Sequence, residues 1–284
     1  MERALTEPDP LPPAGVSASD WERVLQARRE ETEIERLRRL GPEVQPDGIV
    51  ASTDEVGVRR PEKRRWLEIR TACVRTATGY RYLSGTAQTV LQQLYGLLVL
   101  CGGISAKLTL LGDGARWIAQ FFKERLVAWA DSELIIDWYH LCKKCYELSS
   151  LIARGRVAKK ALLGILMYRL WRGQLDEALA LLEAYRPQAK DTDSLETLIK
   201  YLRDRHAYLP NYKARRAQRQ YIGSAHAEKA CDLLVARRQK HQGMHWREAS
   251  SDGLAALRML LLNGGWDLYL KEQQVLPLAV PKAT

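Results

Sequence analysis

Three acidic residues that are far apart in the chain stand where carboxylates commonly do chemistry. Asp54 lies in a strand-like stretch whose neighbours should be buried, and an acid there is costly unless it is paired, hydrogen-bonded or bound to a cation. Asp113 lies between two glycines directly after an apolar run, and Glu228 lies in the first turn of an expected helix. Local roles are the alternative, because such an Asp also suits a turn and such a Glu also suits the helix dipole. The three are therefore candidate catalytic residues.

Basic residues gather in groups that should flank these acids. The formal net charge is +10, from 44 Lys and Arg against 34 Asp and Glu, which favours a polyanionic partner. Basic side chains of this kind hold DNA phosphates without reading the base sequence, although a solvated charged face is the alternative. The residues expected to contact DNA are Arg59, Arg60, Lys213, Arg215, Arg216, Arg219, Arg237, Arg238 and Lys240.

The elements that must position these residues begin as strands. Short runs rich in β-branched residues lie on both sides of the basic segment 59–65 and predict an antiparallel hairpin. Later strands alternate with helices, which predicts a mixed α/β sheet. The expected strands are 49–58, 66–76, one near Tyr80 and Tyr82, 107–111 and 134–137, and the expected helices between them are 86–100 and 115–128.

The strand pattern stops after Leu141. From there to Tyr221, leucines recur at helical spacing, as in Leu162, Leu166 and Leu170, so this whole stretch is expected to be helical. Further helices are expected at 19–40, 224–240 and 253–262. These patterns divide the chain into an N-terminal arm and helix (1–46), a first part of the α/β core (47–140), a helical insertion (141–221) and a last part of the core (222–284).

Composition argues against several classes of protein. No apolar run approaches the roughly 18 residues that a membrane helix needs. The first residues contain acids and prolines where a signal peptide would have a basic start and an apolar run. The 5 cysteines are an odd number and lack a secretory context, which argues against a disulfide framework. We therefore expect a soluble cytoplasmic protein with reduced thiols and no membrane partner.

Several motifs occur in a fixed order along the chain. They are GDGARWI at 112–118, IIDWYH at 135–140, LPNYK at 209–213, GSAHAEKA at 223–230 and ARRQKHQGMHW at 236–246. Together they resemble the Kra-type bacterial insertion-sequence transposases, which belong to the Mutator-like group of DDE transposases, and the resemblance covers roughly 47–281. The chain departs from that pattern at Ala225, where glycine is usual, and at Lys229, where some relatives have a small residue. It also has less sequence before the first strand than full-length relatives, which carry a larger DNA-binding region there.

The resemblance implies an RNase H-like mixed sheet with a large all-helical insertion before the last catalytic residue. It implies that Asp54, Asp113 and Glu228 are the three catalytic carboxylates and hold two Mg²⁺ or Mn²⁺ ions. The implied activity is DNA cleavage and strand transfer of an insertion sequence. The implied partners are double-stranded DNA, at the element ends and the target, and further copies of the chain in a homodimer or larger assembly. The implied location is the bacterial cytoplasm, at the nucleoid.

The signature between the second and third carboxylates has competing interpretations. Asp137 and His140 match an Asp-x-x-His signature of the family, yet Asp137 also suits a helix cap. His140 suits a packed, hydrogen-bonded imidazole, and the alternatives are direct metal ligation or the positioning of a phosphate or a flipped base near the cut. Cys142 and Cys145 have the spacing of half a zinc site but lack a second pair. Two other functions stay open: a domesticated or truncated, catalytically silent DNA-binding protein, and an RNase H-like nuclease without strand transfer.

Overall fold

The protein is described from a computed structural model, which defines residues 48–61, 66–76, 79–241 and 243–266. The helix expected at 19–40 and the N-terminal arm lie outside these residues. None of the helices in the described ranges is long and apolar enough to cross a membrane.

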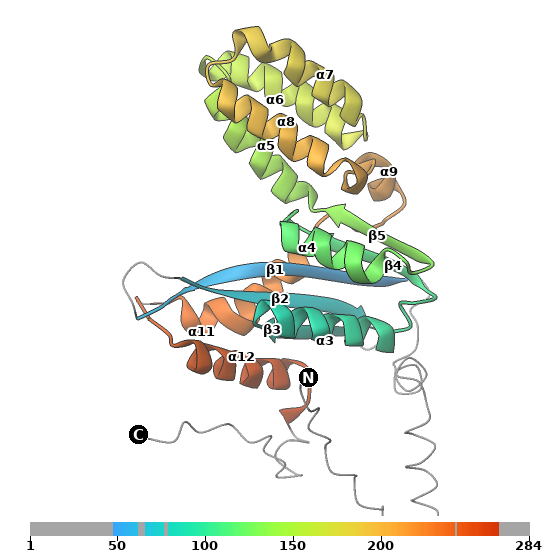
Figure 1. The fold of residues 1–284 in the computed structure, drawn as a ribbon, viewed down its shortest axis with the longest axis vertical. Helices are drawn as coiled ribbons and strands as arrows, with labels where there is room; N and C mark the ends of the chain where they lie inside the picture. Colours follow the sequence, from blue (N-terminus) through green and yellow to red (C-terminus); the bar gives the residue numbers. More distant parts are fainter. Residues whose placement is uncertain (1–47, 62–65, 77–78, 242, 267–284) are drawn as a thin grey trace, which may run out of the picture.

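A five-stranded mixed sheet forms the centre of the fold, in the order β3-β2-β1-β4-β5 (Figure 1). The expected hairpin is confirmed, because β1 and β2 pair antiparallel and β3 continues the meander. Strand β4 returns parallel to β1, and β5 lies parallel to β4. The strands are β1 (Ile49–Arg59), β2 (Trp66–Thr76), β3 (Gly79–Gly85), β4 (Lys107–Gly112) and β5 (Asp131–Ile136).

Two helices cover one face of the sheet. Helix α3 (Ala87–Leu100) buries Val90, Leu94 and Leu98, which recur every four residues and so share one side of the helix. Helix α4 (Arg116–Phe121) continues into a π-helical turn (Phe122–Leu126). Side chains from both helices pack with alternate residues of β1, β2 and β4 in one apolar core.

The opposite face carries the C-terminal helices. Helix α10 (Ala225–Cys231) runs through a π-helical turn (Asp232–Ala236) into α11 (Arg237–Gln239), and α12 (Glu248–Leu262) follows. A second apolar core lies between these helices and β1 and β2. Because alternate strand residues face opposite sides, the sheet separates the two cores.

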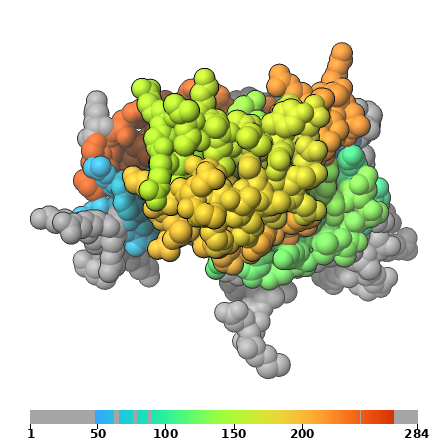
Figure 2. Space-filling model, turned by 90° about the horizontal axis from the view of Figure 1, so that it is seen from above, coloured from blue at the N-terminus to red at the C-terminus, as the bar shows by residue number. Residues whose placement is uncertain are grey.

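A block of helices stands beyond the β5 edge of the sheet (Figure 1). Figure 2 shows the same block from above. Its core consists mainly of leucines at helical spacing and continues onto Leu111, Ile135 and Ile136 of the sheet. The block comprises α5 (Trp138–Ile152), α6 (Gly155–Trp171), α7 (Leu175–Tyr185), α8 (Thr192–Asp204) and α9 (Tyr212–Ala217), with short 3₁₀ turns at Arg186–Gln188 and His206–Tyr208.

Some element boundaries differ from the sequence predictions. The last strand covers Asp131–Ile136 instead of 134–137, because Asp137 leaves the sheet to begin α5. Helix α12 begins at Glu248, five residues before the expected start at Gly253. The expected helices at 115–128 and 224–240 each contain a π-helical turn, which the apolar spacing did not indicate.

Candidate active site

The sheet brings Asp54 and Asp113 to the same region. Strands β1 and β4 run parallel with Ser52 opposite Leu111. Asp54 follows Ser52 by two residues within β1, and Asp113 follows Leu111 by two residues, just after the end of β4. Alternate residues share a face, and the antiparallel partner of Asp54 in β2 is Thr71. Asp113 follows the carboxyl end of β4, where α/β sheets commonly place their sites.

Helix α10 brings Glu228 to the same face. Its Cys231 lies against β2, with Sγ 3.0 Å from the hydroxyl of Thr71, the residue paired with Asp54. Glu228 precedes Cys231 by one helical turn and so lies on a similar side of the helix. Its side chain is 57% exposed, which leaves the carboxylate open to solvent or ligand.

Burial and neighbouring charges both act on the carboxyl group of Asp54. Burial raises its pKa above the ordinary value, and the negative charges of Asp113 and Glu228 raise the pKa further. The Glu55 amide donates to Asp54 Oδ1 at 2.8 Å and acts in the opposite direction, as does His140. The charges of Asp113 and Glu228 therefore both act on Asp54, and a bound cation would relieve this repulsion. Neighbouring Glu55 is exposed and faces Arg70 at 4.0 Å, so it is a poorer candidate than Asp54.

The donor set of these acids suits a hard cation, because carboxylate oxygens are the ligands that Mg²⁺ prefers. As the side chains stand, no group of three His, Cys, Asp or Glu in the described part of the chain is close enough to hold a metal ion jointly. Strand β1, the end of β4 and helix α10 place the three acids in one region of the fold. In this structure their carboxylate oxygens are not close enough together to share an ion.

The buried carboxylate of Asp137 links the starts of two helices, α5 and α10. As the N-cap of α5, its Oδ1 accepts hydrogen bonds from the amides of Tyr139 at 2.6 Å and His140 at 2.9 Å. Its Oδ2 accepts from both the amide and the hydroxyl of Ser224, which precedes α10. Burial raises the pKa of Asp137, but the hydrogen bonds outweigh burial and bring the pKa down to about 2. Capping, one of the two roles weighed from sequence, is confirmed, and the link to α10 is an addition.

His140 lies between Asp137 and Glu228. Its Nδ1 is 3.4 Å from Asp137 Oδ1, and its Nε2 is 3.9 Å from Glu228 Oε1. The Asp137 carboxylate raises the pKa of His140, burial lowers it, and the charges of Asp54 and Asp113 add to the rise. The net result is a raised pKa, which favours the protonated, positively charged form of the His140 imidazole beside the acids.

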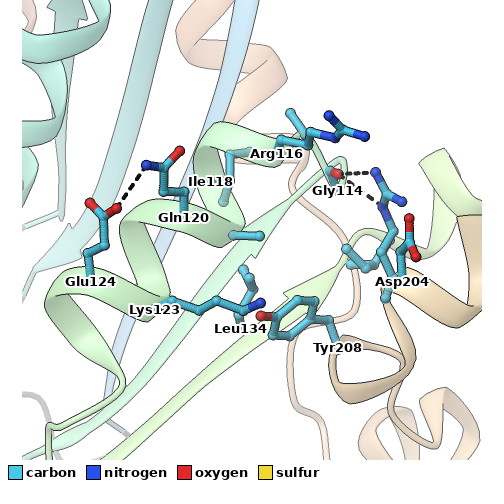
Figure 3. Close-up of a pocket in the computed structure, with 13 residues that line it drawn as sticks. Gly114, Arg116, Ile118, Gln120, Lys123, Glu124, Leu134, Asp204 and Tyr208 are labelled. Atoms are coloured by element: carbon cyan, nitrogen blue, oxygen red, sulfur yellow. Dashed lines mark hydrogen bonds between the residues drawn. The ribbon is translucent and has the colours of Figure 1, made fainter.

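Arg205 was not indicated by the sequence, although it holds the turn that carries Asp113. Its guanidinium donates to the Gly114 carbonyl through Nε at 3.0 Å and Nη2 at 2.7 Å (Figure 3). Gly114 has a φ of 88°, and an added Cβ would lie 2.7 Å from Arg205 Nε, so only glycine suits this position. In the sequence, the glycine that follows Asp113 was the one signal that another group approaches this turn closely.

Arg205 also separates two hollows. One, of about 630 Å³, lies between α4 and the end of α8 and is shown in Figure 3. The other, of about 320 Å³, is lined by Asp113 and His140 of the candidate site and by Lys143, Lys144 and Glu147. The two lysines give this cleft positive charge next to the acids.

The basic residues predicted to bind DNA fall into different environments. Arg215 is a correction: it is buried and donates to Glu133 at 2.8 Å and 3.0 Å, so its charge is used inside the fold. Arg60 pairs with Glu248 and Arg237 with Asp232, while Arg59 lies over the Trp66 ring. The exposed residues with no ion pair recorded among the described residues are Lys213, Arg216, Arg219, Arg238 and Lys240.

The neighbours Arg215 and Arg216 form a matched pair for experiment. Arg216→Glu should weaken binding to unrelated DNA duplexes and make it less salt-dependent while leaving the fold intact, because Arg216 is exposed. Arg215→Glu should instead lower the free energy of unfolding by about 3–5 kcal/mol, because it leaves Glu133 facing a second carboxylate. Denaturant unfolding and fluorescence anisotropy at several salt concentrations measure the two effects. Equal loss of stability in both variants would contradict this assignment.

The cysteine pair is part of the packing. Cys145 is fully buried in the core of the helical block, and burial raises its pKa to about 12. Burial likewise raises the pKa of Cys142 to about 11. Burial therefore favours the protonated form of both thiols, and Cys145 serves the packing of the helical block.

Comparison with known proteins adds no assignment to this geometry. No protein-family model matches the sequence, and no curated protein matches it.

Proposed function

We propose that this chain is a DDE-type transposase that cleaves DNA and joins a DNA strand to a target in a metal-dependent reaction. The observation that carries the proposal is the placement of three acids from separate elements around His140: Asp113 lines a cleft with His140, Glu228 Oε1 lies 3.9 Å from His140 Nε2, and Asp54 is paired with Thr71, which contacts the helix of Glu228. Acids beside a histidine whose pKa is raised, His140, and beside Lys143 and Lys144 suit a phosphodiester substrate.

The topology supports an RNase H-like core as part of this proposal. A meander of three antiparallel strands is followed by two parallel strands on the β1 side, in the order β3-β2-β1-β4-β5. The first acid stands on the central β1, the second follows β4, and the third lies on a helix after the helical block. This is the arrangement that the sequence motifs imply.

Each group near the cleft has a distinct role in the proposed reaction. Asp54, Asp113 and Glu228 would hold one or two Mg²⁺ ions. Bound divalent ions supply positive charge at the attacking and leaving oxygens of phosphoryl transfer. His140 and the nearby lysines attract the phosphate oxygens, and His140 can hold a proton on Nε2.

Asp137 does not act on substrate in this scheme. It is a positioning residue, because its two oxygens fix the start of α5, which bears His140, and the start of α10, which bears Glu228. Arg205 has a similar task for Asp113 through the Gly114 carbonyl.

The test uses the purified chain, supercoiled plasmid and a pre-cut duplex with a free 3′-hydroxyl, taken from the DNA that flanks the gene. We expect joined product in Mg²⁺ or Mn²⁺ and none after chelation. Plasmid nicking without joining would favour the RNase H-like nuclease, and DNA binding without either product would favour the silent DNA-binding protein. Either result contradicts the transposase proposal.

A further inference from the structure

A basic pocket lies on the same sheet face as the carboxylates but nearer the start of β1. The pocket has a volume of about 420 Å³. In the sheet, Val50 is paired with both Thr109 and Arg75, as Asp54 is paired with Thr71, so pocket and acids share one face. Asp54 lies four positions after Val50 in β1, which corresponds to roughly 13 Å. We call it the β1 pocket; its lining residues are Val50, Arg75, Lys107, Thr109, Arg215, Gln218, Arg219, Gln220 and Tyr221.

The charge of the β1 pocket is positive. Four of its lining residues are basic, and no residue in its lining is acidic. Arg215 is neutralised from below by Glu133, whose Oε1 also accepts from Thr109 at 2.6 Å. Within the described part of the chain, no carboxylate lies within ion-pair distance of Arg75, Lys107 or Arg219. Three positive charges in one hollow repel each other, and an anion would relieve that repulsion.

The walls of the pocket are held in place. Arg75 Nη1 lies 3.4 Å from the Tyr221 hydroxyl, and its guanidinium is 6.0 Å from the centre of that ring. Arg215 Nε donates to the Tyr221 carbonyl at 3.2 Å and fixes the loop after α9. Arg219 in this loop has a φ of 58°, a left-handed conformation that costs free energy in a non-glycine residue. Strained residues of this kind concentrate at binding sites.

We propose that the β1 pocket binds a phosphate group, supplied by the backbone of the DNA strand that enters the active site. Arginine and lysine donors with amide side chains are typical phosphate ligands. The short distance along β1 suits a second phosphate of the same duplex. The DNA source rests on the proposed function, whereas the affinity of the pocket for phosphate does not.

The first arm of the experiment measures phosphate binding by NMR with pyrophosphate as the probe. Amide resonances of Lys107, Gln220 and Tyr221 should shift saturably in the full chain. The shifts should be lost in Lys107→Gln/Arg219→Gln and kept in Lys160→Gln, which removes one exposed lysine on α6, remote from the pocket. Absence of these shifts in the unaltered chain, with its fold intact, would overturn the proposal.

The second arm identifies the source of the phosphate. Affinity for a short duplex is measured at several salt concentrations, and Lys107→Gln should reduce the salt dependence by about one counterion relative to Lys160→Gln. Pyrophosphate shifts without this change would assign the pocket to a free phosphate compound and overturn the DNA source. Neither arm requires cleavage, so failure of the proposed function leaves both results interpretable.

Discussion

Replacing Asp113 by asparagine is expected to reduce DNA cleavage and joining by at least about 10²–10³-fold, the size of effect seen when one preorganised charge-stabilising group is removed from an active site. Asparagine keeps the shape and can still accept the 2.8 Å hydrogen bond from the Ala115 amide, so the turn after β4 should survive. What it removes is the negative charge next to Asp54. DNA affinity should therefore persist while turnover is lost.

The matched control is Asp176→Asn on α7, because that side chain is 90% exposed and lies in the helical block. Its activity should equal that of the unaltered chain. Circular dichroism and DNA binding monitor the fold, and a joining assay measures turnover. If Asp113→Asn joins DNA at the original rate in Mg²⁺, the catalytic assignment is wrong.

Replacing Asp137 by asparagine should strongly reduce the stability of the fold. Four donors converge on this buried carboxylate, and an amide can accept at only one of the two positions, so its NH₂ would face the donors of Ser224. We expect the free energy of unfolding to fall by about 3–5 kcal/mol, as for other broken buried charge networks. Thermal and urea unfolding measure this loss.

The pH dependence provides a second measure of the same network. The folded-state pKa of Asp137 is about 2, below its ordinary value of 3.8, so its contribution is present above about pH 4 and is lost as pH falls toward 2. This shift corresponds to about 2 kcal/mol. The stability gap between the two proteins should narrow in that window. A constant gap down to pH 2 would contradict the charged network.

A control for Asp137 is available in the helical block. Asp191 caps α8 by accepting from the Ser194 amide at 3.0 Å, near the surface. Asparagine caps helices about as well as aspartate, so Asp191→Asn should change stability little. A similar loss in both variants would mean that capping alone explains Asp137.

The sequence predicted local elements well, because their signals are local. The hairpin of β1 and β2 follows from β-branched runs around a turn, and α3 follows from an apolar four-residue period. The positions of Asp54 and Asp113 also followed, since each lies within or directly after a recognisable strand. The predicted mixed sheet is confirmed, and within it β1 and β4 are parallel neighbours.

The sequence pattern did not predict which side chains from distant parts of the chain would bond to one another. Arg215 belongs to a run of exposed basic residues and looks like one of them, but Glu133, which is 82 positions away, draws it into the interior. Asp137 could be recognised as a cap, whereas its bonds to Ser224, 87 positions later, depend on how α10 docks. The side-chain approach needed for a metal ion likewise depends on packing that no local signal encodes.

The docking of α10 also determines when the site becomes complete during synthesis. The contact between Thr71 and Cys231 joins residues 160 positions apart, with the whole helical block between them. Such nonlocal contacts form late in folding. At about 5–20 residues per second, the ribosome delivers Cys231 on the order of ten seconds or more after Thr71. A nascent chain thus carries Asp54 and Asp113 well before Glu228, so the proposed site stays incomplete until α10 has been made and has docked.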